Sequence, residues 1–133
     1  YNGQRYQKAA KFHTDTKNIA SKIPLTRVES LLESVTEGMS LVCVELVEGA
    51  MPLPTFQHPE NACYLFGPED GNLPQELVSE ADAVVYIPTI GCMNLAATVN
   101  VLLYDRLAKS STINMGNELI RQSRDTNNTL KVG

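Results

Sequence analysis

The chain has 133 residues, of which 43% are hydrophobic and 20% charged, and its formal net charge is −4 at pH 7. These values fit a single globular domain, residues 1–133, that is large enough to bury a core. No apolar run approaches the roughly 18 residues that a membrane helix needs, and no N-terminal stretch has a signal-peptide pattern. The sequence therefore predicts a cytoplasmic protein with no membrane partner.

The cysteines are odd in number and contain no C-x-x-C pair. They are Cys43, Cys63 and Cys92. Cys43 and Cys63 lie in apolar runs, which is typical of reduced core residues in a cytosolic protein. We therefore expect neither a disulfide framework nor a metal site.

Charge is unevenly distributed along the chain. Residues 1–27 contain six Lys and Arg side chains and one Asp, a net charge of +5, which leaves −9 for the remaining residues. A basic segment on an acidic body favours a surface that contacts nucleic-acid phosphates. A solvated basic loop fits the charge alone equally well.

The first part of the chain is polar. Residues 1–24 lack clear periodicity, so we expect a long loop with a short helical turn near residues 8–12. Thr26 and Glu29 then form the T-x-x-E pattern of a capping box, which predicts the start of a helix that ends at Gly38. The apolar face of this helix follows at helical spacing: Val28, Leu31, Leu32 and Val35.

Three short apolar runs predict buried strands, at residues 41–47, Ala62–Phe66 and residues 83–87. Gly49 and three prolines predict an irregular connection between the first two strands. Helical patterns follow at residues 75–81, Leu95–Lys109 and 117–124, and residues 125–133 are expected to form a flexible tail. Strands that alternate with helices indicate an α/β fold, with a parallel sheet flanked by helices.

The helix predicted at Leu95–Lys109 has a wide apolar face. Its members are Leu95, Ala96, Val99, Leu102, Leu103 and Leu107. This face is wider than a single contact uses, so we expect burial on two sides, against the sheet and against a second subunit. Burial wholly within the same chain, by the C-terminal tail, is the alternative.

Two loops follow the second and third predicted strands. Residues 67–74 read GPEDGNLP, and residues 87–94 read IPTIGCMN. Loops at the ends of neighbouring parallel strands would face the same edge of a sheet, where open α/β sheets bind ligands. Ile87 and Ile90 offer apolar surface for the face of a flat ring.

These loops carry a resemblance to a known family. FGPEDGNLP resembles the second signature of the SPOUT methyltransferases, in their SpoU/TrmH branch. IPTIGCMNLAATVNVLLYDRL resembles the third, which in relatives reads I-P, then S-[ML]-N, then a helix ending in V-x-L-Y-[DE]. The resemblance implies an S-adenosylmethionine-dependent RNA methyltransferase, acting on the ribose 2′-O of tRNA or rRNA. It also implies a C-terminal deep trefoil knot and a homodimer formed through Leu95–Lys109.

The resemblance also implies roles for particular residues. The cofactor-binding positions carried over are Val44, Gly67, Ile87, Cys92 and Met93. The catalytic candidates are Glu69, which would accept hydrogen bonds from a ribose or orient an arginine, and Asn94, which would contact the substrate or fix its loop. Each has a structural alternative: Gly67 as a strand-to-helix turn, Glu69 as a solvated carboxylate, and Asn94 as the N-cap of the following helix.

The sequence departs from the family pattern in two places. Cys92 stands where many relatives have Ser, and a thiol is a weaker hydrogen-bond partner than a hydroxyl. The first strand, the first helix and the Arg of the family's first motif are not found in residues 1–133, and Arg5 does not lie in that context, so we expect this chain to be a fragment that lacks its beginning. Two other functions therefore stay open: a non-catalytic knotted, dimeric RNA-binding module, and an unrelated flavodoxin-like domain that binds a phosphate.

Overall fold

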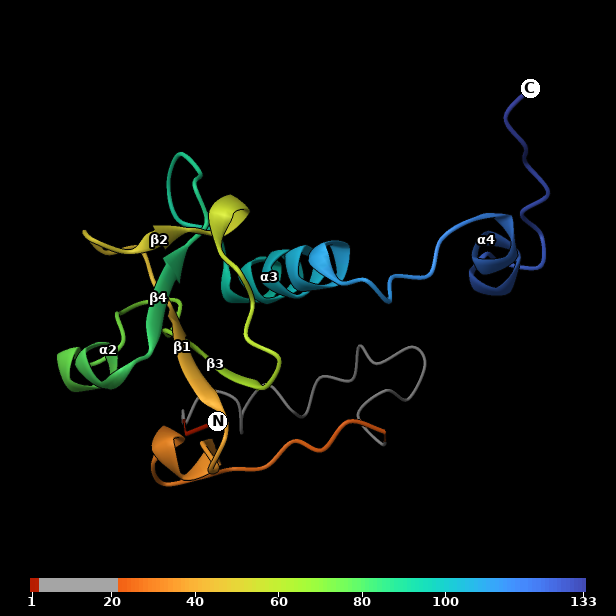
Figure 1. Ribbon diagram of the computed structural model, residues 1–133. Helices are drawn as coiled ribbons and strands as arrows, with labels where there is room; N and C mark the ends of the chain where they lie inside the picture. Colours follow the sequence, from red (N-terminus) through yellow and green to blue (C-terminus); the bar gives the residue numbers. More distant parts are fainter. Residues whose placement is uncertain (3–21) are drawn as a thin grey trace.

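The computed structural model describes residues 1–2 and 22–133 (Figure 1). Its strands are β1 (Ser40–Val44), β2 (Met51–Pro52), β3 (Ala62–Phe66) and β4 (Ala83–Tyr86). Its helices are the 3-10 turns η2 (Leu31–Ser34) and η3 (Leu53–Thr55), and α2 (Gln75–Glu80), α3 (Leu95–Lys109) and α4 (Asn117–Ser123). The turn predicted at residues 8–12 and most of the basic segment lie outside the described residues.

The strands form one parallel sheet in the order β2-β4-β1-β3. β1 is an interior strand that pairs with β3 from Ser40↔Ala62 to Val44↔Phe66, and with β4 from Val42↔Ala83 to Val44↔Val85. The predicted parallel α/β sheet flanked by helices is therefore confirmed. The expectation that the strands before the two loops are neighbours is wrong, because β1 lies between β3 and β4.

Helices cover both faces of this sheet. Val42 and Val44 belong to a core cluster with β4, η3 and α3, whereas Leu41 and Cys43 belong to a second cluster with η2 and α2. This division follows from strand geometry, because successive side chains point to opposite faces.

Burial raises the pKa of the Cys43 thiol, with smaller contributions from Glu45 and Cys63, and burial also raises the pKa of Cys63. Both thiols are free, as expected of reduced cysteines.

The helix predicted to begin at Thr26 is shorter and begins later. Ser30 precedes η2, and the Glu33 carboxylate accepts the Ser30 N–H at 3.0 Å, so the capping pair is one turn further along the chain. The physical reason is a backbone contact with Tyr1. The Tyr1 nitrogen donates to the Thr26 carbonyl at 3.1 Å, and the Val28 N–H donates to the Tyr1 carbonyl at 2.9 Å. These bonds occupy the backbone groups that a helix at this point would use.

The connection after β1 is less irregular than predicted. β1 ends at Val44 rather than Val47, and β2 adds a short edge strand in which Met51 pairs with Val85 and Pro52 with Tyr86. Proline is tolerated there because the outer side of an edge strand needs no N–H donor. The other boundaries agree with the prediction to within one residue, and α3 begins and ends where its sequence pattern indicates.

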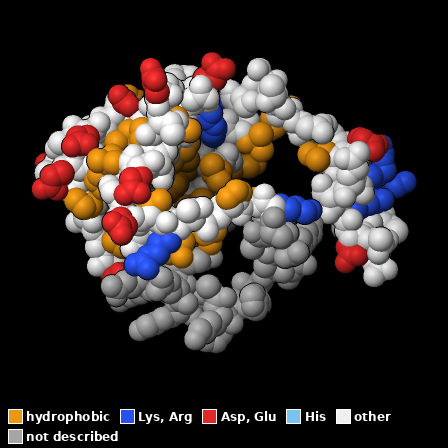
Figure 2. Space-filling model, turned by 90° about the horizontal axis from the view of Figure 1, so that it is seen from below, with side chains coloured by type: hydrophobic (Ala, Val, Ile, Leu, Met, Phe, Trp, Pro, Cys, Tyr) orange, Lys and Arg blue, Asp and Glu red, His pale blue; other side chains and the backbone are white. Residues whose placement is uncertain are grey.

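Helix α3 is buried on one side only. Leu102 is fully buried against the sheet, whereas Leu103 is 50% exposed and Leu107 47% exposed. Beyond α3 the chain leads to α4, which stands apart from the sheet (Figure 1). Figure 2 shows hydrophobic side chains open to solvent in the middle of one face, with acidic side chains gathered on the side away from the C-terminal segment. The other side of α3 is not covered within the described residues, and the expected contact with a second subunit and the trefoil knot both stay predictions.

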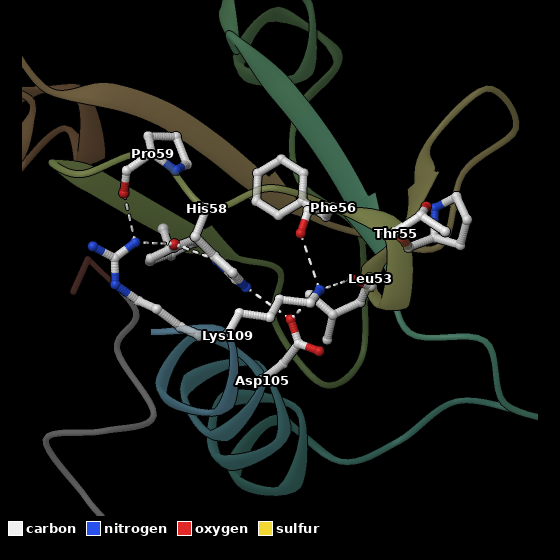
Figure 3. A network of polar contacts seen from close by, with 10 residues as sticks. Leu53, Thr55, Phe56, His58, Pro59, Asp105 and Lys109 are labelled. Atoms are coloured by element: carbon white, nitrogen blue, oxygen red, sulfur yellow. Dashed lines mark hydrogen bonds and ion pairs between the residues drawn. The ribbon is translucent and has the colours of Figure 1, made fainter. Parts of the chain in front are cut away.

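A polar network joins α3 to the segment between η3 and β3 (Figure 3). His58 lies between Asp105, whose Oδ2 is 2.8 Å from Nε2, and Tyr64, whose hydroxyl is 2.7 Å from Nδ1. Because an ionised carboxylate only accepts, we assign the donated hydrogen to Nε2, and Nδ1 then accepts from the Tyr64 hydroxyl. Lys109 Nζ lies 2.7 Å from the same Asp105 oxygen.

The same network reaches four backbone carbonyls in residues 53–60. Lys109 donates to the carbonyls of Leu53 and Phe56, and Arg106 donates to those of Pro59 and Glu60. Arg106 also donates to the Tyr64 hydroxyl at 2.8 Å. The last turns of α3 are therefore held against residues 53–60 by charged groups rather than by apolar packing alone.

The pKa of Asp105 makes stability depend on pH. Burial opposes its ionised form, but the hydrogen bonds from Lys109 and His58 outweigh burial and lower its pKa below the ordinary value of 3.8. Its contribution to stability is therefore complete above that ordinary value and is lost as the pH falls through the lower value of the folded state. Asp105→Asn should be less stable at neutral pH and lose less stability below about pH 4.

Urea unfolding at a series of pH values would test this expectation. Asp125→Asn, in the exposed C-terminal segment, removes the same charge and is the matched control. If Asp105→Asn and the parent chain lose stability in parallel below about pH 4, the network does not couple Asp105 to folding.

Candidate functional site

A pocket opens where β1, β3 and β4 end. It is lined by the end of β1, by residues of the loops 67–74 and 87–94, and by the first turn of α3. Its cavity volume is about 140 Å³, and the empty space including its open mouth is about 730 Å³. The two loops follow strands on either side of β1, so they meet across its end, where open α/β sheets bind ligands.

The pocket gathers nearly all the residues selected from the sequence. The predicted cofactor-binding residues Val44, Gly67, Ile87, Cys92 and Met93 line it, and Glu69 does so as well. Ile90 does not: its side chain is fully exposed, and only Ile87 of the two predicted apolar surfaces faces the pocket.

Asn94 is not part of the pocket lining. Its side-chain oxygen accepts the Ala97 N–H at 2.8 Å, so it is the N-cap of α3. Its carbonyl accepts from both the backbone and the hydroxyl of Thr98. The capping role is therefore confirmed. The two roles are compatible, and a contact of Asn94 with the substrate stays a prediction.

The loop 87–94 has an ordered turn. Gly91 has a φ of 84°, which L side chains rarely adopt, and the Thr89 hydroxyl donates to the Gly91 carbonyl at 3.0 Å. The Cys92 thiol that follows is exposed at the pocket, unlike the buried Cys43. This end of the pocket is therefore shaped by backbone conformation more than by charged side chains.

Glu45 is a pocket residue that the sequence reasoning missed. Its Oε2 accepts the Leu73 N–H at 3.0 Å, and its Oε1 accepts the Leu46 N–H at 3.0 Å. The signal that would have found it is its position, because it is the first charged residue after a buried strand, at the edge of the sheet where ligands bind.

The electrostatic character of the pocket is acidic. Among the described residues, its lining contains the carboxylates of Glu45 and Glu69 and no Lys or Arg. In the same part of the chain, no group of His, Cys, Asp and Glu could hold a metal ion. This lining suits a ligand with hydroxyl groups or positive charge, and it lacks the cationic side chains typical of phosphate sites.

Fold and site together define a parallel α/β domain with a small-molecule pocket at the carboxyl ends of its strands. The chain matches the SpoU rRNA Methylase family over residues 3–104, a span that includes the whole pocket, and it belongs to that family. Membership indicates a methyltransferase that acts on RNA. Comparison with curated proteins gives no match to this chain. None of the helices in the described ranges is long and apolar enough to cross a membrane.

The capping role of Asn94 can be separated from a chemical one. Asn94→Ala should lower the free energy of unfolding by about 1 kcal/mol, because the Ala97 N–H loses its acceptor. Asn94→Asp keeps a capping oxygen and should stay close to the parent. Thermal unfolding of both variants measures the difference. Equal stability of the Ala and Asp variants would show that the cap contributes nothing.

Proposed function

We propose that this protein is an S-adenosylmethionine-dependent RNA methyltransferase that modifies the ribose 2′-O of tRNA or rRNA. The observation that carries the proposal is the meeting of the two signature loops at one pocket, across the end of β1. Family membership supports the reaction class, and the pocket supports the identity of the cofactor.

The residues present fit S-adenosylmethionine. Val44, Ile87 and Met93 offer apolar surface to an adenine ring, and Gly67 and Cys92 line the same pocket. Glu45 and Glu69 supply negative charge, which suits ribose hydroxyls and the positive charges of the methionine portion. Cys92 in place of Ser leaves the backbone as the stronger hydrogen-bonding group at that position.

When bound, the cofactor supplies an electrophilic methyl group on a sulfonium. The work of this chain is then to place a ribose hydroxyl in line with that methyl and to exclude water, and such positioning accounts for much of the rate of a group transfer. Glu69 lies at the pocket on the loop 67–74, where it would accept a hydrogen bond from a ribose. The net charge of +5 in residues 1–27 supports contact with RNA phosphates.

Filling the pocket should block cofactor binding. Cys92→Trp places a large side chain at an exposed residue of the lining, so the fold should tolerate it while the dissociation constant for S-adenosylmethionine rises more than about tenfold. Isothermal titration calorimetry on the full-length protein measures this change. Ile90→Trp is the matched control, because Ile90 is in the same loop, fully exposed and outside the lining.

The outcomes of this experiment distinguish the rival functions. Unchanged binding by Cys92→Trp would place the cofactor elsewhere. A parent protein that binds RNA but not S-adenosylmethionine would favour the non-catalytic RNA-binding module.

We also propose that the protein is a homodimer that associates through α3. Next to this helix lies an apolar groove, lined mainly by Leu53, Pro54, Ile87, Pro88, Val101 and Tyr104. Tyr104 is 67% exposed in the single chain. Covering such a surface contributes about 25 cal/mol per Å² of apolar area, and a two-fold contact would cover it on both subunits.

A charge placed in the groove should oppose this association. Val101→Glu adds a carboxylate at a partly exposed position, so the monomer should fold while its dimerisation weakens, since a buried unpaired charge is costly. Sedimentation velocity at micromolar protein measures the result, with Val132→Glu in the exposed C-terminal segment as the control. A parent that sediments as a monomer, or a Val101→Glu variant that dimerises like the parent, would contradict the proposal.

A further inference from the structure

Glu45 occupies the space between the two signature loops. It directly follows β1, and its backbone N–H donates to the Val85 carbonyl of β4 at 3.0 Å. Its side chain turns the other way and accepts the Leu73 N–H near the end of the loop 67–74. One residue therefore connects the strand that leads into one loop with the backbone of the other.

Both ends of the loop 67–74 meet this carboxylate. At the far end, Leu73 donates its N–H to Glu45 Oε2 while its side chain is buried in the second core cluster. At the near end, a Cβ added to Gly67 would lie 2.6 Å from the same Oε2, closer than real Cβ contacts allow. The space that a side chain at position 67 would fill is thus already taken by Glu45.

This geometry gives Gly67 a specific reason to be glycine. Gly67 is not among the glycines with positive φ in the described chain, so its backbone conformation does not require glycine. The next nearest atom to the added Cβ is the Leu73 nitrogen at 3.5 Å, which is ordinary contact. The conflict is therefore with one atom at the end of a flexible side chain, so a residue larger than glycine would be accommodated by moving the oxygen that accepts the Leu73 N–H.

We propose that Glu45 is a positioning residue of the cofactor pocket, and that Gly67 is needed because Glu45 must approach the loop backbone there. The inference rests on the proposed function for its ligand. The carboxylate forms a charge-assisted hydrogen bond with a backbone N–H, a stronger class of bond than a neutral pair. It holds the loop 67–74 in the conformation that lines the pocket. A side chain at position 67 would displace the carboxylate from Leu73 and release the loop.

The proposal predicts that the two residues act as one unit. Glu45→Ala and Gly67→Ala should each raise the dissociation constant for S-adenosylmethionine about tenfold, the value of one charge-assisted hydrogen bond. The double variant should bind about as well as either single variant, because both changes break the same contact. Calorimetry on the full-length protein measures all four dissociation constants. A hundredfold loss in the double variant, the product of two independent effects, would overturn the proposal.

Two further variants separate positioning from general loss of structure. Glu45→Gln keeps one side-chain oxygen for the Leu73 N–H but loses the charge, so it should recover part of the affinity lost by Glu45→Ala. Glu48→Ala removes an exposed carboxylate from the same stretch and should bind like the parent. If Glu45→Gln is as weak as Glu45→Ala, or if Glu48→Ala is equally weak, the hydrogen bond to Leu73 is not the cause.

A measurement without ligand tests the contact independently of the proposed function. Gly67→Ala is introduced into the parent and into the Glu45→Ala variant, and the urea unfolding midpoint is measured for each. The substitution should lower the midpoint more in the parent, because the clash with the Glu45 carboxylate is absent in the Glu45→Ala background. If the parent fails to bind S-adenosylmethionine, the proposed function fails while this coupling is still measured. If the coupling appears in unfolding but the single variants bind the cofactor like the parent, Glu45 stabilises the fold only and the positioning role is wrong.

Discussion

The pairing of β1 with strands on both of its sides is the interaction on which the rest of the structure depends. Because β1 bonds to β3 along one edge and to β4 along the other, the loops after those strands open at its end. The same strand supplies buried side chains to the core clusters on both faces of the sheet. A change within residues 40–44 would therefore disturb the core and the pocket together.

Sequence patterns predicted the elements that local interactions determine. Helix α3 begins as its pattern indicates because Asn94, at the end of the loop 87–94, caps its first turn. The family signatures also identified residues that gather at one pocket, although they lie in separate parts of the chain. The helix expected from Thr26 failed for the opposite reason: a backbone contact with Tyr1, 25 residues away in sequence, competes with it.

The features that sequence reasoning missed are polar contacts between distant residues. Glu45 meets Leu73 across 28 positions, and His58 meets Asp105 across 47. No period or spacing encodes such pairs, because they follow from the order of the strands, which single-chain patterns do not give. Asp105 stands at the acidic end of the V-x-L-Y-[DE] pattern, and its contacts with His58 and Lys109 give that position a structural role in this chain.

Ile87 lines both the pocket and the apolar groove beside α3. A side chain has one conformation at a time, so whatever fixes Ile87 from the groove also fixes the surface that it presents to the pocket. Coupling between two binding events is reciprocal: if the first raises the affinity of the second by some factor, the second raises the affinity of the first by the same factor. If filling the groove changes affinity in the pocket, a ligand in the pocket changes association at the groove by the same factor. Raising the protein concentration would then change the affinity for the ligand, and raising the ligand concentration would change dimerisation, through the same coupling free energy.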